Sequence, residues 1–144
     1  MEKVNVIEDE TLGALYGRDC IFIDSVGQND AGKLVIKGEI NGHLADKIKG
    51  DKWIPFNLVF HNVIAYFACE IDTYFNIYSY KNINNSDFNL LENSQWLNKM
   101  SIRKDYDNLS IYKHYQVLTY DNAFDIIAES HELNCDLANA RTMK

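Results

Sequence analysis

Few of the residue types that carry chemistry occur in this chain at spacings that would let them act together. His131-Glu132 begins like the zinc-binding sequence H-E-x-x-H, but Cys135 stands where the second histidine is required. The seven glycines form neither phosphate-binding loop, G-x-x-x-x-G-K or G-x-G-x-x-G. Cys20, Cys69 and Cys135 are too far apart in sequence for a typical zinc site or disulfide framework. The sequence therefore predicts no metal site, no cofactor and no catalytic nucleophile.

His114 and Glu70 are the pair that could perform general acid–base chemistry. His114 lies in one predicted strand, and Glu70 and Asp72 lie at the end of another. If these two strands pair, the imidazole and the carboxylate meet, which is the minimum for proton transfer. One hypothesis is therefore a small hydrolase or ligand-binding domain with a cleft around His114 and Glu70. The alternative is a histidine that is exposed or hydrogen-bonded within its strand.

The region from Tyr115 to Ala140 holds five acids and no lysine or arginine. On an α-helix these acids would share an arc of about 80°. They are Asp121, Asp125, Glu129, Glu132 and Asp136. Carboxylates four residues apart repel one another, so the predicted stripe needs lysines from elsewhere in the fold or a basic partner. We expect the last four acids to be exposed along one edge, as a solvated face paired within the fold or as a docking surface for a basic protein.

Aromatic side chains are the second candidate for recognition, since the chain has nine tyrosines and two tryptophans. Tyr74, Tyr78 and Tyr80 share one face of a predicted extended segment. Aromatic residues often fill the core beside a sheet, and they also anchor protein interfaces. Under the second interpretation these tyrosines join the five acids as the predicted partner-binding residues.

Alternation of apolar and polar residues dominates the chain and indicates strands. The predicted strands cover 20–26, 33–40, 53–60, 63–72, 74–80, 88–92 and 110–120, with a tight turn at His61-Asn62. Ser94 is predicted to cap a short helix over 95–100, and Asp121 a second helix over 122–133. The predicted core residues are Phe56, Leu58, Phe60, Phe124 and Ile127. The expected fold is one α+β domain over 1–144, a mostly antiparallel sheet of five to seven strands with these two helices, because the links are too short for β-α-β crossovers.

The balance of charge narrows the classes of partner. The formal net charge is −7, from 14 bases and 21 acids, so phosphate backbones and anionic membrane surfaces repel the chain. No apolar run approaches the roughly 20 residues that span a bilayer. The first ten residues do not have the composition of a signal peptide. We therefore expect a cytoplasmic protein that binds neither nucleic acid nor membrane, and whose charge suits a basic protein partner.

Several segments of the sequence are similar to segments of other small proteins. They are Lys37-Gly38-Glu39-Ile40-Asn41-Gly42, Trp53-Ile54-Pro55-Phe56-Asn57-Leu58, Asn93-Ser94-Gln95-Trp96-Leu97 and the run from Lys113 to Asp121. Together they resemble small uncharacterised proteins of low-GC bacteria, and some similar acidic α+β proteins are immunity proteins encoded beside secreted toxins. The resemblance implies binding of another protein rather than catalysis. The leading hypothesis is a non-enzymatic, immunity-type protein that neutralises a basic toxin; a third possibility is a structural subunit that self-associates through a sheet edge.

Overall fold

The structure is a computed structural model, and it describes residues 2–77, 86–100 and 111–143. The strands in these ranges are β1 (Lys3–Val6), β2 (Ile21–Gln28), β3 (Leu34–Asn41), β4 (Lys52–His61), β5 (Ala65–Glu70), β6 (Phe88–Glu92), β7 (Lys113–Leu118), β8 (Asn122–Ala128), β9 (Ser130–Cys135) and β10 (Arg141–Thr142). The helices are α1 (Ile71–Ile77), α2 (Gln95–Met100) and the 3-10 turns η1 (Gly42–Leu44) and η4 (Leu137–Asn139). Neither α-helix of this described part is long and apolar enough to cross a membrane.

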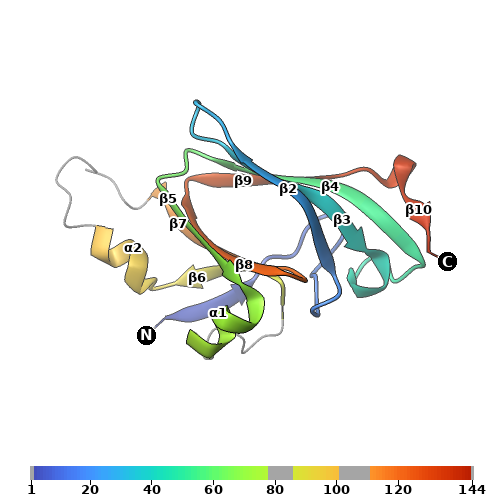
Figure 1. Cartoon of the computed structure of the whole chain (residues 1–144), viewed down its shortest axis with the longest axis horizontal. Helices are drawn as coiled ribbons and strands as arrows, with labels where there is room; N and C mark the ends of the chain where they lie inside the picture. Colours follow the sequence, from blue (N-terminus) through green and yellow to red (C-terminus); the bar gives the residue numbers. More distant parts are fainter. Residues whose placement is uncertain (1, 78–85, 101–110, 144) are drawn as a thin grey trace.

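The strands form two five-stranded antiparallel sheets that face each other (Figure 1). The first sheet has the order β1-β6-β7-β8-β5. The second has the order β10-β4-β3-β2, and β9 pairs with β4 farther along the same edge. The predicted antiparallel character is therefore confirmed, with the strands divided between two sheets.

Two chain segments pass from one sheet into the other and join them. β4 continues into β5, and β8 continues into β9. β5 pairs with β8 while β4 pairs with β9, so the four strands form one long bent ladder. Asn62 at the first corner has a φ of +53°, a conformation that asparagine tolerates. The predicted turn is present, but it makes a corner between sheets rather than a tight hairpin, because β4 and β5 pair with different strands.

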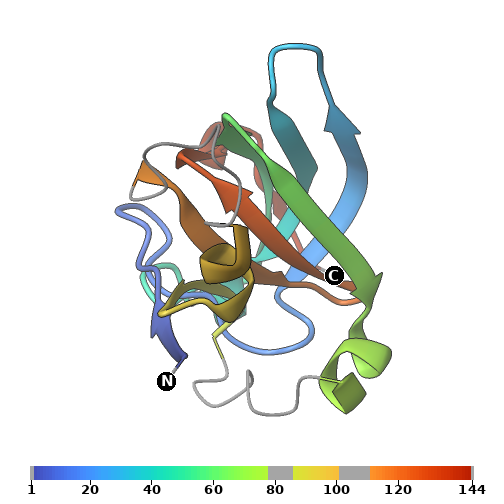
Figure 2. The same cartoon turned by 90° about the vertical axis from the view of Figure 1, so that its left-hand side faces the viewer.

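The main core lies between the sheets. Phe56, Leu58 and Phe60 of β4 pack in one buried cluster with Phe124 of β8, as predicted. Ile127 is also fully buried, but it points to the opposite face of β8, the face that carries Asp125. That outer face of the first sheet is covered by the two short helices, and Figure 2 shows α2 in front of its strands. Alternate residues of β7 and β8 are thus buried on both sides of the sheet.

The helix predicted over 122–133 is wrong, because this segment forms β8 and most of β9. Every residue from Ala123 to Ala128 is buried, one half against the core between the sheets and the other half on the outer face. A strand covered on both faces loses the alternation of apolar and polar residues, and its periodicity then no longer distinguishes it from a buried helix. By contrast, α2 spans the range 95–100 predicted for the short helix.

The strand predicted over 74–80 is also wrong as far as the structure describes it, since α1 runs to Ile77. Glu70 begins this helix: its carboxylate accepts the backbone N–H groups of Asp72 and Thr73, both at 2.9 Å. These bonds stabilise the ionised form and lower the pKa of Glu70. The capping interaction of Glu70 therefore favours a helix in this segment, although the pattern of aromatic residues suggested an extended chain.

Candidate functional site

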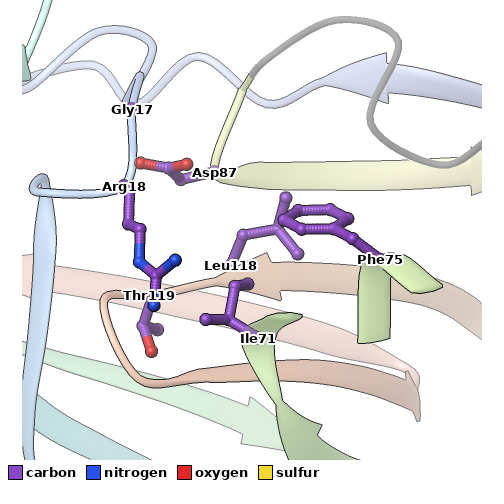
Figure 3. Close-up of a pocket in the computed structure, with 7 residues that line it drawn as sticks. All are labelled: Gly17, Arg18, Ile71, Phe75, Asp87, Leu118 and Thr119. Atoms are coloured by element: carbon purple, nitrogen blue, oxygen red, sulfur yellow. The ribbon is translucent and has the colours of Figure 1, made fainter. Parts of the chain in front are cut away.

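A cavity of about 220 Å³ lies at the end of the first sheet where β6 begins and β7 ends. Its walls come from the loop before β2, from α1, from the residue before β6 and from the β7–β8 turn (Figure 3). The lining residues are Gly17, Arg18, Ile71, Phe75, Asp87, Leu118 and Thr119. Ile71 and Phe75 are one helical turn apart, so α1 presents both side chains to the same side. The walls are mostly apolar, with Asp87 and Arg18 as the ionisable groups.

The backbone holds Asp87 firmly in place. Its N–H donates to the carbonyl of Leu15 and its carbonyl accepts the N–H of Leu118, each at 2.7 Å. The adjoining loop turns at Gly17, whose φ of +96° strains any residue with a side chain. These bonds fix the backbone of Asp87 at the wall of the cavity.

The Asp87 carboxyl group is the most unusual feature of the cavity. The residue is 5% exposed, and its Oδ2 atom is buried without a hydrogen-bond partner among residues 2–77, 86–100 and 111–143. Burial raises the pKa of Asp87 to about 8, and a contact with the Cys20 thiol opposes this rise only in part. Burial likewise raises the pKa of Cys20. At neutral pH Asp87 is therefore mostly in its neutral acid form.

Arg18 lies at the mouth of the cavity, and its guanidinium group binds residues other than Asp87. Its Nη1 donates to Oδ1 of Asp72 at 2.7 Å, and its Nε donates to the carbonyl of Tyr120 at 3.3 Å. The guanidinium also lies over the Tyr120 ring, 5.6 Å from its centroid. The hydrogen bond to Asp72 raises the pKa of Arg18, and the negative charges of Asp72 and Glu70 add to this effect. Since Asp72 balances the charge of Arg18, the Asp87 carboxyl group has no ion pair with any of the described residues.

A second group of polar side chains lies beneath α2. The Oγ of Ser94 is 2.6 Å from Nδ1 of His114, and Nε2 of His114 is 2.6 Å from Oδ1 of Asp125. This is the order of groups in a Ser-His-Asp triad. However, none of the three residues is more than 3% exposed. The Ser94 oxygen also accepts the N–H of Leu97 at 3.0 Å and so caps α2, as predicted.

The same network extends to α1. The hydroxyl of Tyr74 donates to Asp125 at 3.3 Å and accepts from Nε2 of Gln116 at 3.1 Å. Gln116 in turn accepts from Nδ2 of Asn89 at 2.8 Å. This network joins Ser94 below α2 to Tyr74 on α1. We therefore infer that its hydrogen bonds hold both helices on the sheet.

The structure does not bring His114 and Glu70 together. In the strand register His114 pairs with Ile127 and Glu70 pairs with Asn122, five residues apart along β8. That separation corresponds to roughly 17 Å. His114 meets Asp125 instead, a partner that was hidden by the helix predicted over this region. The predicted acid–base couple therefore does not form, although Glu70 does lie beside Arg18 at the mouth of the cavity.

The five predicted acids do not share one face. Asp125 is buried in β8, against the expectation that it is exposed, while the other four acids are exposed. They are Asp121, Glu129, Glu132 and Asp136. Their even spacing on a helical wheel has no meaning in a strand, which turns its side chains alternately to opposite faces.

Three of the exposed acids have partners within the fold. Glu132 lies 2.8 Å from Nε2 of His61, and Glu129 accepts from Nδ2 of Asn62 at 3.2 Å. Asp136 accepts the N–H at the third residue of η4. Pairing within the fold was one of the two alternatives for these acids. Binding of a basic protein, including the immunity-type hypothesis, stays a prediction.

The predicted tyrosine patch is only partly described. Tyr74 is 0% exposed and faces the sheet, so it is a core residue rather than an anchor at a surface. Tyr78 and Tyr80 lie outside the residues that the structure describes. The exposed aromatic residues of β5 are Tyr66 and Phe67, each 40% exposed.

Sequence reasoning missed Asp87. The residue ends a polar stretch that resembles a turn, and the apolar strand β6 starts directly after it. Its burial depends on Leu15, Cys20 and Leu118, which are remote in sequence. A lone aspartate before a strand gives no local signal of that environment. Among the described residues no three His, Cys, Asp or Glu side chains gather as a metal would require.

Comparison of the chain with protein-family models, with curated proteins and with solved structures gives no match.

Proposed function

We propose that this chain is a small-molecule-binding protein, and that its ligand occupies the cavity beside Asp87. One observation carries the proposal: the buried Asp87 carboxyl group, one of whose oxygens has no hydrogen-bond partner among the described residues, lines a cavity whose other walls are mostly apolar. Leaving a polar group buried and unsatisfied costs about 1–3 kcal/mol, and more when the group is charged. A ligand that bonds to Asp87 would remove this cost.

The form of the cavity agrees with ligand binding. Binding sites are typically apolar hollows with a few well-placed polar groups, and residues with perturbed pKa values mark them. The volume of about 220 Å³ suits a ligand of only a few heavy atoms beyond a single ring, because an apolar cavity of about 150 Å³ holds benzene. Ile71, Phe75 and Leu118 would contact the apolar body of the ligand.

Binding is favoured over catalysis because the cavity presents no activated nucleophile among its described residues. Thr119 is its only hydroxyl group there, and that hydroxyl donates to the carbonyl of Asn122 at 2.8 Å. The serine that does contact a histidine, Ser94, is buried beneath α2 in a separate network. A nucleophile needs a neighbouring base and access to the substrate, and neither residue has both.

The test is a titration with benzyl alcohol, a neutral probe of suitable size, followed by NMR. We expect saturable shifts of the Ile71 and Leu118 methyl signals. Phe75→Trp should fill the cavity and abolish these shifts. Phe67→Trp, which enlarges an exposed aromatic residue on β5, is the matched control and should leave them unchanged. Shifts that do not saturate, or that are equal in the two variants, would overturn the proposed function.

A further inference from the structure

The polar groups around the cavity differ in whether they already have hydrogen-bond partners. Thr119 donates to the carbonyl of Asn122 and accepts the Asn122 N–H at 3.0 Å. Arg18 donates to Asp72 and to the carbonyl of Tyr120. By contrast, Oδ2 of Asp87 has no hydrogen-bond partner in the described part of the chain. A ligand can complete this site by donating to the Asp87 carboxylate or by accepting from the O–H of its neutral acid form.

The charges around the cavity favour a cationic donor. Asp72 balances Arg18, and Glu70 adds a further negative charge beside the same guanidinium. The group that faces Asp87 from the start of β2 is the Cys20 thiol, which burial keeps protonated. An anionic ligand would meet three carboxyl groups and one arginine already paired. A cation would instead form a charge-assisted hydrogen bond, which is roughly twice as strong as a neutral one.

We propose that the cavity selects a small organic cation, a primary ammonium group on a short apolar body, which pairs with the Asp87 carboxylate. This inference rests on the proposed function, since it names the class of ligand for the same cavity. The ammonium group would donate to the Asp87 carboxylate, and the apolar body would lie against Ile71, Phe75 and Leu118. Arg18, held by Asp72 at the mouth, would stay in place.

Binding of such a cation is coupled to release of a proton. In the empty cavity Asp87 is mostly a neutral acid, because burial raises its pKa to about 8. When the ammonium ion enters, the Asp87 O–H bond breaks and the proton passes to the solvent. The ammonium ion keeps its own protons, so the bound state is the carboxylate–ammonium pair. Affinity should therefore increase about tenfold from pH 6 to pH 7, the range in which each pH unit increases the ionised fraction of Asp87 about tenfold.

The test compares benzylamine, benzyl alcohol and benzoate on the wild-type chain by calorimetry. Benzylamine should bind more tightly than the other two at pH 7 and should release close to one proton, measured in two buffers of different ionisation enthalpy. Its affinity should increase about tenfold from pH 6 to pH 7. Benzyl alcohol should not follow this increase. The benzylamine ammonium group and the Arg18 guanidinium stay protonated over this range.

The Asp87→Asn variant keeps the shape of the side chain and removes the charge. It should lose the preference for benzylamine and the dependence on pH, whereas Asp121→Asn, at an exposed acid, should retain both. If benzyl alcohol binds as tightly as benzylamine without release of a proton, the inference is overturned while the proposed function stands. If none of the three probes binds, both fail. The comparison of the three probes on the wild-type chain needs no variant. It therefore tests the preference for a cation even if Asp87→Asn does not fold.

Discussion

Nε2 of His114 lies 2.6 Å from Oδ1 of Asp125 across the β7–β8 pair, and both side chains are almost completely buried. The pair forms part of the network that holds both helices on the outer face of the first sheet. Two charged or polar groups buried together depend on each other, because the loss of one leaves the other without its partner.

Replacing Asp125 by alanine should therefore destabilise the fold strongly. The variant leaves His114 and Tyr74 buried with an acceptor missing, and breaking a buried pair in this way costs about 3–5 kcal/mol. Urea denaturation measures the free energy of unfolding. Asp121→Ala, at an exposed acid four residues earlier, should change it by less than about 0.5 kcal/mol. A loss below about 1 kcal/mol for Asp125→Ala would mean that the pair contributes little.

Stability should fall with rising pH because of Asp87. Its pKa increases from near 4 in the unfolded chain to about 8 in the folded one, so the folded state binds the extra proton between these values. The stabilising contribution of the extra proton on Asp87 is complete below pH 4, and it is lost as the pH rises through 8. The free energy of unfolding of the wild type minus that of Asp87→Asn should accordingly fall by on the order of a few kcal/mol from pH 5 to pH 8.5. A difference that does not change with pH would show that Asp87 titrates normally.

Gly38 should tolerate no side chain. A Cβ atom there would lie 1.9 Å from the carbonyl oxygen of Phe22, beside the irregularity in β2 at Ile23/Ser25. Gly38→Ala should thus cost at least about 1–3 kcal/mol in thermal or urea denaturation. Gly27 provides the control in the same strand pair, since nothing lies within 4 Å of its Cβ position. Gly27→Ala should be neutral or slightly stabilising.

Phe124 should be a major contributor to the core. It is 3% exposed between the sheets, and truncation of a buried phenylalanine to alanine costs about 3–5 kcal/mol. Phe67 on the neighbouring strand β5 is 40% exposed, so Phe67→Ala should cost much less. Similar losses in the two variants, measured by urea denaturation, would contradict the assignment of Phe124 to the core.

Local sequence patterns correctly predicted the strands that have one face on the core and the other toward solvent. β6 covers the predicted 88–92, and β3 and β4 alternate as expected with one face on the core. Pro55 also agrees with its place in β4: its carbonyl accepts the N–H of Asp136, so its missing donor points to the gap between the end of β9 and the start of β10. A proline is tolerated at such a position because it has no N–H to donate to a neighbouring strand.

Features that depend on distant residues escaped prediction. The burial of Asp125 requires α1 and α2 on the outer face of the sheet, and that of Asp87 requires Leu15 and Leu118. Neither environment leaves a periodic trace near the residue itself. The helix predicted over 122–133 failed for the same reason, because tertiary contacts on both faces of β8 replaced the alternation that marks a strand.

The bent ladder also determines when this chain can fold during synthesis. β2, β3 and β4 are complete once residue 61 has emerged, but the strands that cover and extend them, β8 and β9, end only at Cys135. At roughly 5–20 residues per second, the ribosome leaves the apolar face of β4 without its partners for several seconds. The row Ile54, Phe56, Leu58 and Phe60 is therefore the segment that a chaperone would meet on the nascent chain.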